Sequence, residues 1–359
     1  MIKASKKHGF EPDYAVPPGE TLKEVIDSMA MTQKDLSERT GLTVQSINRI
    51  IKGDQPITYE TANALELVTG VSARMWNTLE ANYREQLEKI QERERLEKDV
   101  DWLKTIPVKE LIKRGYISDI KDNALQLREV LKFFEVSSVA GWGRLWDQPK
   151  VAARRSACFE SMPGYASTWI RMGEIEAGKI DCKPYDKKIF ESALVEIKKL
   201  TVLDPQESIP KMRQLCADSG VALSLIPEMP KVPWNGATKW LNPNKVMILL
   251  SLRGKGEDIF WFSFFHEAAH VLHDNRKDLY INDNAKEDPK ELAADKFASN
   301  FLIPEKYKTA LLNIKSQQEI ALLAEKLGVC PGIVAGQYRF MTKKWSWFNN
   351  VIRSFCWGT

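Results

Sequence analysis

The sequence predicts a mostly α-helical protein with one small β-sheet, which is an α+β fold class. Helical periodicity dominates the first quarter of the 359 residues, where apolar side chains recur every three or four positions. Three short apolar runs, at 221–226, 238–241 and 245–252, predict strands, and Asn242-Pro243-Asn244 predicts a turn between the last two. Because a domain averages ~150 residues, this length predicts two or three domains.

The composition excludes several classes of protein. Hydrophobic residues make up 43% and charged residues 28%, which is typical of a globular protein and not of a disordered one. No apolar run approaches the ~18 residues of a membrane span, and the N-terminus lacks the apolar segment of a signal peptide. Five widely spaced cysteines without a Cys-x-x-Cys pair predict reduced thiols and no cysteine-built zinc site. We therefore expect a cytoplasmic protein with no membrane partner.

The net charge does not by itself indicate nucleic-acid binding. The formal net charge is +4, but residues 1–95 contain 13 Lys and Arg against 15 Asp and Glu. An interaction of this part with nucleic acid must therefore depend on a local cluster of basic side chains.

Residues 19–95 predict five helices. The buried face of the first is a set of apolar residues spaced i, i+3, i+4 and i+7, namely Leu22, Val25, Ile26 and Met29. Thr32, with Asp35 three residues later, predicts a capped second helix that begins at Gln33. Thr43 caps a third helix, whose predicted inward residues are Val44, Ile47 and Ile51. A fourth helix spans about 59–69, and Ser72 caps a fifth helix that runs into the highly charged stretch 85–104.

The second and third of these helices, joined at Gly41, have the spacing of a helix-turn-helix. In such a pair the second helix lies in the major groove and its N-terminal side chains contact base edges. The candidates for base contacts are Thr43, Gln45, Ser46 and Arg49. The candidates for phosphate contacts are Gln33, Lys34, Asn48 and Lys52. A plain helical bundle with a solvated polar face fits the spacing equally well.

A resemblance favours the DNA-binding interpretation. Residues 17–85 resemble the Xre-type repressors of the HigA antitoxin branch, through motifs spread over the whole segment. These motifs are Pro18-Gly19-Glu20-Thr21-Leu22, Met31-Thr32-Gln33-Lys34-Asp35-Leu36, Ile50-Ile51-Lys52-Gly53, Ile57-Thr58-Tyr59-Glu60-Thr61-Ala62 and Trp76-Asn77-Thr78-Leu79. The resemblance implies a lambda-repressor-like fold and a homodimer on a palindromic double-stranded DNA operator.

A second constellation predicts a metal site. The sequence His266-Glu267-Ala268-Ala269-His270 lies in a predicted helix over about 259–273, so both histidines share one helix face. They can bind one zinc ion, while Glu267 addresses a water on that ion as general base. Short patterns of this kind also arise by chance, and a site with two histidines needs a third ligand.

The helix predicted from 291 to 302 offers that ligand. Glu291 and Asp295 are spaced i and i+4, so both lie on one helix face. Glu291 can complete a His₂Glu site, and Asp295 can orient a ligand histidine by contacting its far ring nitrogen. A solvated helix face is the alternative for this pair. His273 is either an extra ligand or, as we favour, a polar residue in the last helical turn.

The same region resembles the ImmA/IrrE family of metallopeptidase domains over roughly residues 150–345. The clearest motifs are Trp261-Phe262-Ser263-Phe264-Phe265-His266-Glu267, Ala294-Asp295-Lys296-Phe297-Ala298, Phe301-Leu302-Ile303-Pro304 and Gly236-Ala237-Thr238-Lys239-Trp240-Leu241. The resemblance implies a zincin-like, gluzincin-type fold with bound Zn²⁺. For active family members it also implies a cut in one specific repressor.

These observations divide the chain into five predicted segments. They are a flexible tail at 1–18, a helix-turn-helix domain at 19–95, a helical middle region at 96–200, a metallopeptidase domain at 201–345 and an aromatic tail at 346–359. The helical segment 320–340 is either a decayed second helix-turn-helix or, as we favour, part of the peptidase core. The terminal aromatic residues either contact a membrane or partner, or pack on the protein. The strand 238–241 is either an edge that accepts an extended peptide or an internal strand.

Two functional hypotheses follow. In the first, the chain is a DNA-binding transcriptional regulator with a zinc-dependent peptidase that cuts a repressor or antitoxin-like protein. In the second, it is a HigA-like antitoxin and autorepressor, whose peptidase-like domain does not cut and instead senses a ligand or binds a toxin.

Overall fold

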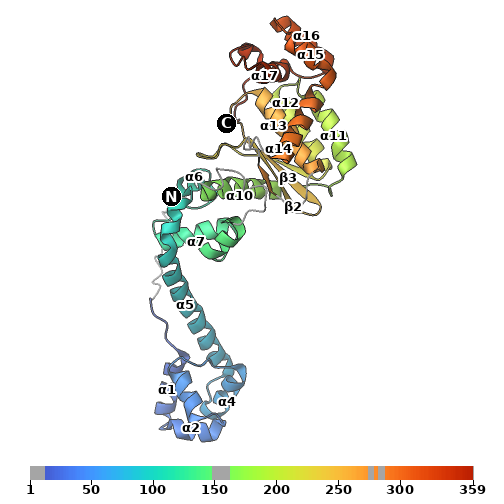
Figure 1. The fold of residues 1–359 in the computed structure, drawn as a ribbon. Coiled ribbons are helices and arrows are strands. Elements are labelled where there is room, and N and C mark those ends of the chain that lie inside the picture. The colour runs from blue at the N-terminus through green and yellow to red at the C-terminus, as the bar shows by residue number, and fades with distance from the viewer. Residues whose placement is uncertain (1–12, 148–161, 274–278, 282–287, 359) are drawn as a thin grey trace, which may run out of the picture. The chain divides into compact units, whose positions relative to one another are not determined.

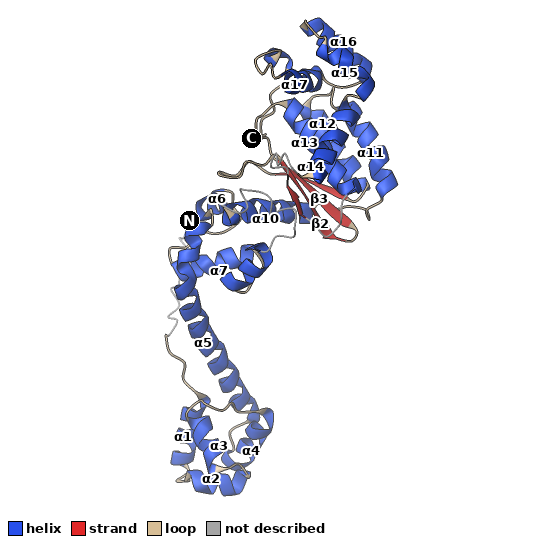
Figure 2. Cartoon of the chain, viewed as in Figure 1, coloured by secondary structure: helices blue, strands red, loops and turns tan. Residues whose placement is uncertain are grey.

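The computed structural model describes residues 13–147, 162–273, 279–281 and 288–358, and for 279–281 it describes the backbone only. The helices and the small sheet are drawn in Figures 1 and 2. The described chain divides into two compact units, one formed by the residues up to Val100 with Lys121–Leu127, the other by Asp101–Ile120 and Arg128–Thr359. Mostly helical structure with one small sheet confirms the predicted fold class.

Five α-helices form the first unit. They are α1 (Pro18–Ser28), α2 (Gln33–Thr40), α3 (Val44–Ile51), α4 (Tyr59–Thr69) and α5 (Ala73–Asp99). Thr32 and Asp35 form the expected capping box at the start of α2, and the Thr43 hydroxyl accepts the backbone N–H of Ser46 at the start of α3. Gly41 joins the two helices in the left-handed conformation with φ 75°, which favours glycine.

One expectation for this unit is wrong. The spacing predicts Val44, Ile47 and Ile51 as inward residues, but Val44 is 44% exposed and Ile51 is half-buried, whereas Ile47 and Ile50 are buried. The buried face of α3 is therefore rotated toward Ile47 and Ile50, and Val44, at the first helical position, lies off this face.

The second unit contains a four-stranded sheet in the order β1-β3-β2-β4. The strands are β1 (Val221–Leu225), β2 (Gly236–Asn242), β3 (Lys245–Leu250) and β4 (Leu279–Ile281). β1 is parallel to β3, whereas β2 is antiparallel to both β3 and β4. Because β2 pairs on both sides, its interpretation as an edge for a bound peptide is wrong, and the internal alternative is right.

Helices cover both faces of this sheet. On one face, Val246 and Ile248 pack in a core with Phe264 and Phe265 of α13 (Glu257–His273). On the other face, Met247 and Leu249 pack in a second core with residues of α10 (Pro163–Lys179). Successive residues of β3 alternate between the two cores, as the pleat of a strand requires.

The other described helices lie in the second unit, except that Val100 and the first part of α7, up to Leu127, belong to the first unit. They are η1 (Val100–Thr105), α6 (Val108–Lys113), α7 (Asn123–Phe133), α8 (Val139–Trp142), η2 (Gly143–Asp147), α11 (Lys187–Leu200), α12 (Pro205–Asp218), α14 (Pro289–Leu302), η4 (Glu305–Tyr307), α15 (Lys308–Leu312), α16 (Gln317–Leu327), α17 (Pro331–Thr342) and η5 (Asn349–Val351). Residues of α16 and α17, among them Ile320 and Tyr338, are buried in the core that contains α13. Segment 320–340 thus packs on the peptidase-like core, as we favoured.

The C-terminal segment is also packed and does not project as a free tail. Phe355 is buried, and the backbone of Ser354 pairs with that of Gly256 just before α13. The Arg353 guanidinium donates to the fully buried Glu257 carboxylate at an Nε–Oε2 distance of 2.6 Å. These contacts fix the start of α13. Across the described residues, no helix combines the length and the apolar character that spanning a membrane requires.

Candidate functional site

The helix α13 holds the His-Glu-Ala-Ala-His segment inside the second unit. Every residue from Ser263 to Leu272 is buried, including all three polar residues of the motif. The aromatic side chains of Trp261, Phe264 and Phe265 anchor the helix in the core beside the sheet. A helix packed this densely allows its side chains little freedom, so the two histidines are held in fixed positions.

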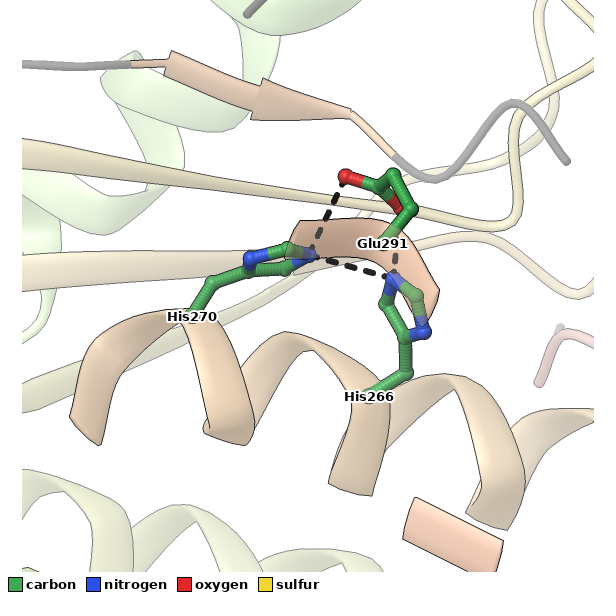
Figure 3. Close-up of side chains that lie close together, drawn as sticks. All are labelled: His266, His270 and Glu291. Atoms are coloured by element: carbon green, nitrogen blue, oxygen red, sulfur yellow. Dashed lines mark hydrogen bonds and ion pairs between the residues drawn. The ribbon is translucent and has the colours of Figure 1, made fainter. Parts of the chain in front are cut away.

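The two histidines face one another and a carboxylate of the neighbouring helix (Figure 3). The distance between the Nε2 atoms of His266 and His270 is 3.1 Å. The Oε2 atom of Glu291 lies 3.0 Å from His266 Nε2, and its Oε1 atom lies 3.3 Å from His270 Nε2. The structure thus brings together three side chains that the sequence separates by up to 25 residues.

Helix α14 supplies the acidic partners. Asp288 caps this helix by accepting the backbone N–H of Lys290, which places Glu291 in the first turn. One turn later, the Asp295 carboxylate lies 2.9 Å from His266 Nδ1. Because Nδ1 is bonded to Asp295, the Nε2 atom of His266 is directed at the shared centre. This is the arrangement expected for Glu291 and Asp295.

The spacing of the three ligand atoms fits a tetrahedral cation. Zinc binds nitrogen and oxygen at about 2.0–2.1 Å, so two donors on one tetrahedral ion lie about 3.3 Å apart. His266 Nε2 lies 3.1 Å from His270 Nε2 and 3.0 Å from Glu291 Oε2, and His270 Nε2 lies 3.3 Å from the other carboxylate oxygen, Glu291 Oε1. With one ligand atom taken from each residue, the three atoms lie within 4.8 Å of one another. A fourth tetrahedral position would belong to none of these three side chains.

Glu267 follows His266 on α13 and lies beside this cluster, and its side chain is completely buried. Its Oε2 atom accepts a hydrogen bond of 2.7 Å from the Thr238 hydroxyl of β2. Its Oε1 atom has no hydrogen-bond partner among the described residues. An unpaired buried carboxylate oxygen is costly, so this position suits a polar group that the described residues do not provide.

Gly236 makes room for the carboxylate of Glu267. A Cβ atom at position 236 would lie 2.6 Å from Glu267 Oε1 and 2.8 Å from its Cγ, which is closer than atoms can approach. Thr238 and Gly236 are therefore the two residues of β2 that position Glu267. The sequence motifs alone predict no role for either residue. A glycine inside a strand often marks such a close approach and could have indicated the first, but the sequence gives no sign of the second.

Burial and mutual contacts shift the pKa values of Glu267, Glu291 and His266. Burial raises the pKa of Glu267 to about 7, against the opposing effect of the two histidines. Burial alone would raise the pKa of Glu291, but hydrogen bonds with His266 and His270 outweigh it and lower the pKa to about 2. Burial would lower the pKa of His266, whereas bonds to Asp295 and Glu291 raise it to about 10. Before any metal binds, the centre therefore favours a negative charge on Glu291 and a proton on His266.

The third histidine of the segment lies outside the cluster. His273 is exposed in the last turn of α13, and its ring makes an edge contact with Phe297 at a centroid distance of 5.5 Å. It is not one of the three residues whose ligand atoms converge. This placement agrees with the interpretation of His273 as a polar residue at a helix end.

In the first unit, the candidate DNA contacts on α3 differ in their exposure and in their hydrogen bonds within the protein. Gln45, Asn48, Arg49 and Lys52 are exposed. Thr43 is also exposed, but its oxygen caps the helix, and the Ser46 hydroxyl exchanges hydrogen bonds with the Gln55 amide. On α2, Gln33 is half-buried. Lys34 is exposed, and its Nζ atom lies 4.0 Å from Glu38 Oε1.

Comparisons with known families match both units. Residues 22–76 match the helix-turn-helix family, and residues 229–337 match the family described as the IrrE N-terminal-like domain. Neither the curated proteins nor the solved structures contain a match to the chain. The two family matches confirm the fusion indicated by the two resemblances, and they support a regulator with a DNA-binding helix-turn-helix and a peptidase-like domain.

We predict that Gly236→Ala lowers the free energy of unfolding by about 1–3 kcal/mol, because the new Cβ must displace the buried Glu267 carboxylate. Gly178→Ala in α10 is the matched control. A Cβ there meets no atom within 4 Å, and alanine is favoured by about 1 kcal/mol in a helix. Urea denaturation of both variants measures the difference. Equal stability of the two variants would contradict the close approach of β2 to Glu267.

Proposed function

We propose that the chain is a DNA-binding transcriptional regulator whose second unit is a zinc-dependent peptidase acting on one specific regulatory protein, a repressor or an antitoxin-like protein. The observation that carries this proposal is the clustering of His266, His270 and Glu291, whose ligand atoms lie within 4.8 Å of one another. The second support is the Oε1 atom of Glu267 beside them, which has no hydrogen-bond partner in the part of the chain that the structure describes.

The donor set favours zinc over other common divalent ions. Two imidazoles and one carboxylate with an open fourth position are typical of catalytic zinc, whereas calcium and magnesium prefer oxygen ligands alone. When bound, zinc lowers the pKa of a coordinated water to about 7 and polarises the scissile carbonyl.

The protein's own residues would then perform the proton transfers. With zinc bound, Glu267 would take a proton from the attacking water and deliver it to the leaving amine, because its Oε1 atom has no hydrogen-bond partner among the described residues. The Thr238 hydroxyl fixes one oxygen of Glu267, so the other oxygen is the one that accepts the proton. Asp295 fixes the orientation of the His266 ring.

We expect about one zinc ion per chain in protein purified without added metal. His266→Ala removes one of three ligands and should leave less than about 0.2 zinc per chain, since each ligand contributes to affinity. His273→Ala is the matched control and should retain a full equivalent, because His273 lies outside the cluster. Elemental analysis by mass spectrometry measures both. Equal metal content in the two variants would contradict the proposed ligands.

One observation favours the alternative, a HigA-like antitoxin with a peptidase-like domain that senses or binds without cutting. His266, Glu267 and His270 are each at most 1% exposed, so a peptide needs a path to the cluster. In this alternative the metal holds α13 and α14 together and the regulatory output is binding.

Glu267→Gln separates the two functions. If the chain is a peptidase, cells that carry the unaltered chain should contain one or a few protein N-termini that are absent when Glu267→Gln replaces it, with zinc content unchanged. Proteome-wide labelling of N-termini measures this. If regulation survives Glu267→Gln and is lost in Glu291→Ala, hydrolysis is not the function and the non-cutting alternative holds.

For the first unit we propose binding of a double-stranded DNA operator by a homodimer, with α3 in the major groove. The exposed side chains Gln45, Asn48, Arg49 and Lys52 support this assignment. Thr43, Ser46, Gln33 and Lys34 remain proposed contacts, although the hydroxyl of Ser46 is already bonded to Gln55.

Arg49→Ala should weaken binding to a DNA site selected from random sequence by about 1–3 kcal/mol, because arginine pairs with the edge of guanine. Arg74→Ala, an exposed arginine at the start of α5, is the control and should change affinity little. Fluorescence anisotropy at fixed salt measures both. Equal affinities would contradict the assignment of α3 as the recognition helix.

A further inference from the structure

A cavity of about 330 Å³ lies beside the cluster, between α13, α14 and α17. Its volume is within the range of pockets that bind small ligands or side chains. Apolar side chains form much of its wall, among them Phe262, Ile333, Phe340 and Trp345.

The cavity begins next to the proposed metal ligands. Asp295 lines it and is also bonded to His266 Nδ1. Phe262 lines it one helical turn before His266, with 6.3 Å between the two ring centres. Asn235, the residue immediately before β2, also lines it. A peptide held at the cluster can therefore extend one side chain into this cavity.

The charged residues that line the cavity are both acidic. They are Asp258 and Asp295, of which Asp295 is already bonded to His266. Asp258 is half-buried at the start of α13, and burial raises its pKa. Two neighbouring charges act on it: Arg339 of α17, which is not among the lining residues, lowers its pKa, and Glu257, which is paired with Arg353, raises it. A cation in the cavity would relieve the cost of burying the Asp258 carboxylate.

Building on the proposed function, we propose that this cavity is a specificity subsite for a basic side chain, lysine or arginine, of the bound peptide. The apolar wall receives the methylene stem, and Asp258 holds the cationic head. Long basic side chains bury their stems in this way while the charge finds a polar partner. An uncharged side chain of the same length would contact the apolar wall but would add no cation to the backbone N–H groups and the Arg339 charge that already act on Asp258.

The test measures binding and does not depend on turnover. Full-length Glu267→Gln protein is titrated by calorimetry with blocked alanine pentapeptides that carry lysine, norleucine or glutamate at the centre. We expect the lysine peptide to bind at least about tenfold more tightly than the norleucine peptide, as a hydrogen bond to a charged group implies. The glutamate peptide should bind most weakly. Equal affinities for lysine and norleucine, or no binding of any peptide, would overturn the proposal.

Variants locate the preference. Asp258→Asn, added to Glu267→Gln, should abolish the tenfold difference, whereas the control Glu325→Gln on the exposed face of α16 should preserve it. Phe340 is 61% exposed, so Phe340→Lys is expected to fold and, by placing a like charge at the cavity, to weaken the lysine peptide selectively. A preference that survives both Asp258→Asn and Phe340→Lys would overturn the assignment to this cavity.

Two further measurements separate the possible failures. Metal content is determined on the same samples: one zinc per chain without a lysine preference refutes the subsite alone, whereas a lysine preference without metal refutes the zinc centre alone. N-acetyl-lysine methylamide carries the lysine side chain without flanking residues. Its titration therefore tests whether the cavity binds a small amine as well as it binds a lysine within a peptide. Binding as tight as that of the lysine peptide would overturn the peptide assignment in favour of a small amine ligand.

Discussion

The candidate site depends on one constraint. Two imidazoles and one carboxylate are held within hydrogen-bond distance of one another inside a hydrophobic core. The distances among His266, His270 and Glu291 are 3.0 to 3.3 Å, and all three side chains are buried or nearly so. Polar groups buried this closely are stabilised by a shared cation or by shared protons. Both alternatives require α13 and α14 to stay in register.

The surrounding structure supplies that register. The sheet supports one side of α13, the buried pair of Arg353 and Glu257 fixes its first turn, and the cap at Asp288 sets where α14 begins. β2 contributes Thr238 and Gly236, which place the Glu267 carboxylate beside the cluster. The C-terminal segment is therefore part of the support for the site, although it contributes no side chain to it.

The sequence predicted the parts of the structure that depend on local chemistry. The caps at Thr32 and Thr43 follow from short-range hydrogen bonds, and the spacing within 266–270 and within 291–295 follows from the helical repeat. What it could not predict depends on contacts between distant segments. The pairing of β2 with β4, the bond from Thr238 to Glu267 and the docking of Arg353 on Glu257 leave no periodic pattern. Val44 is exposed although its spacing predicts an inward position, because a spacing rule cannot fix the rotation of a short helix.

The measurement that tests the central claim most directly is X-ray absorption at the zinc edge on protein purified without added metal. The proposed centre predicts two imidazole nitrogens at about 2.0–2.1 Å and carboxylate or water oxygen at about 2.0–2.2 Å, with no sulfur in the shell. Glu291→Ala removes one of the three proposed ligands, so most of the zinc and its absorption signal should be lost. A sulfur shell near 2.3 Å, or a spectrum without imidazole scattering, would contradict the convergence of these three side chains on one ion.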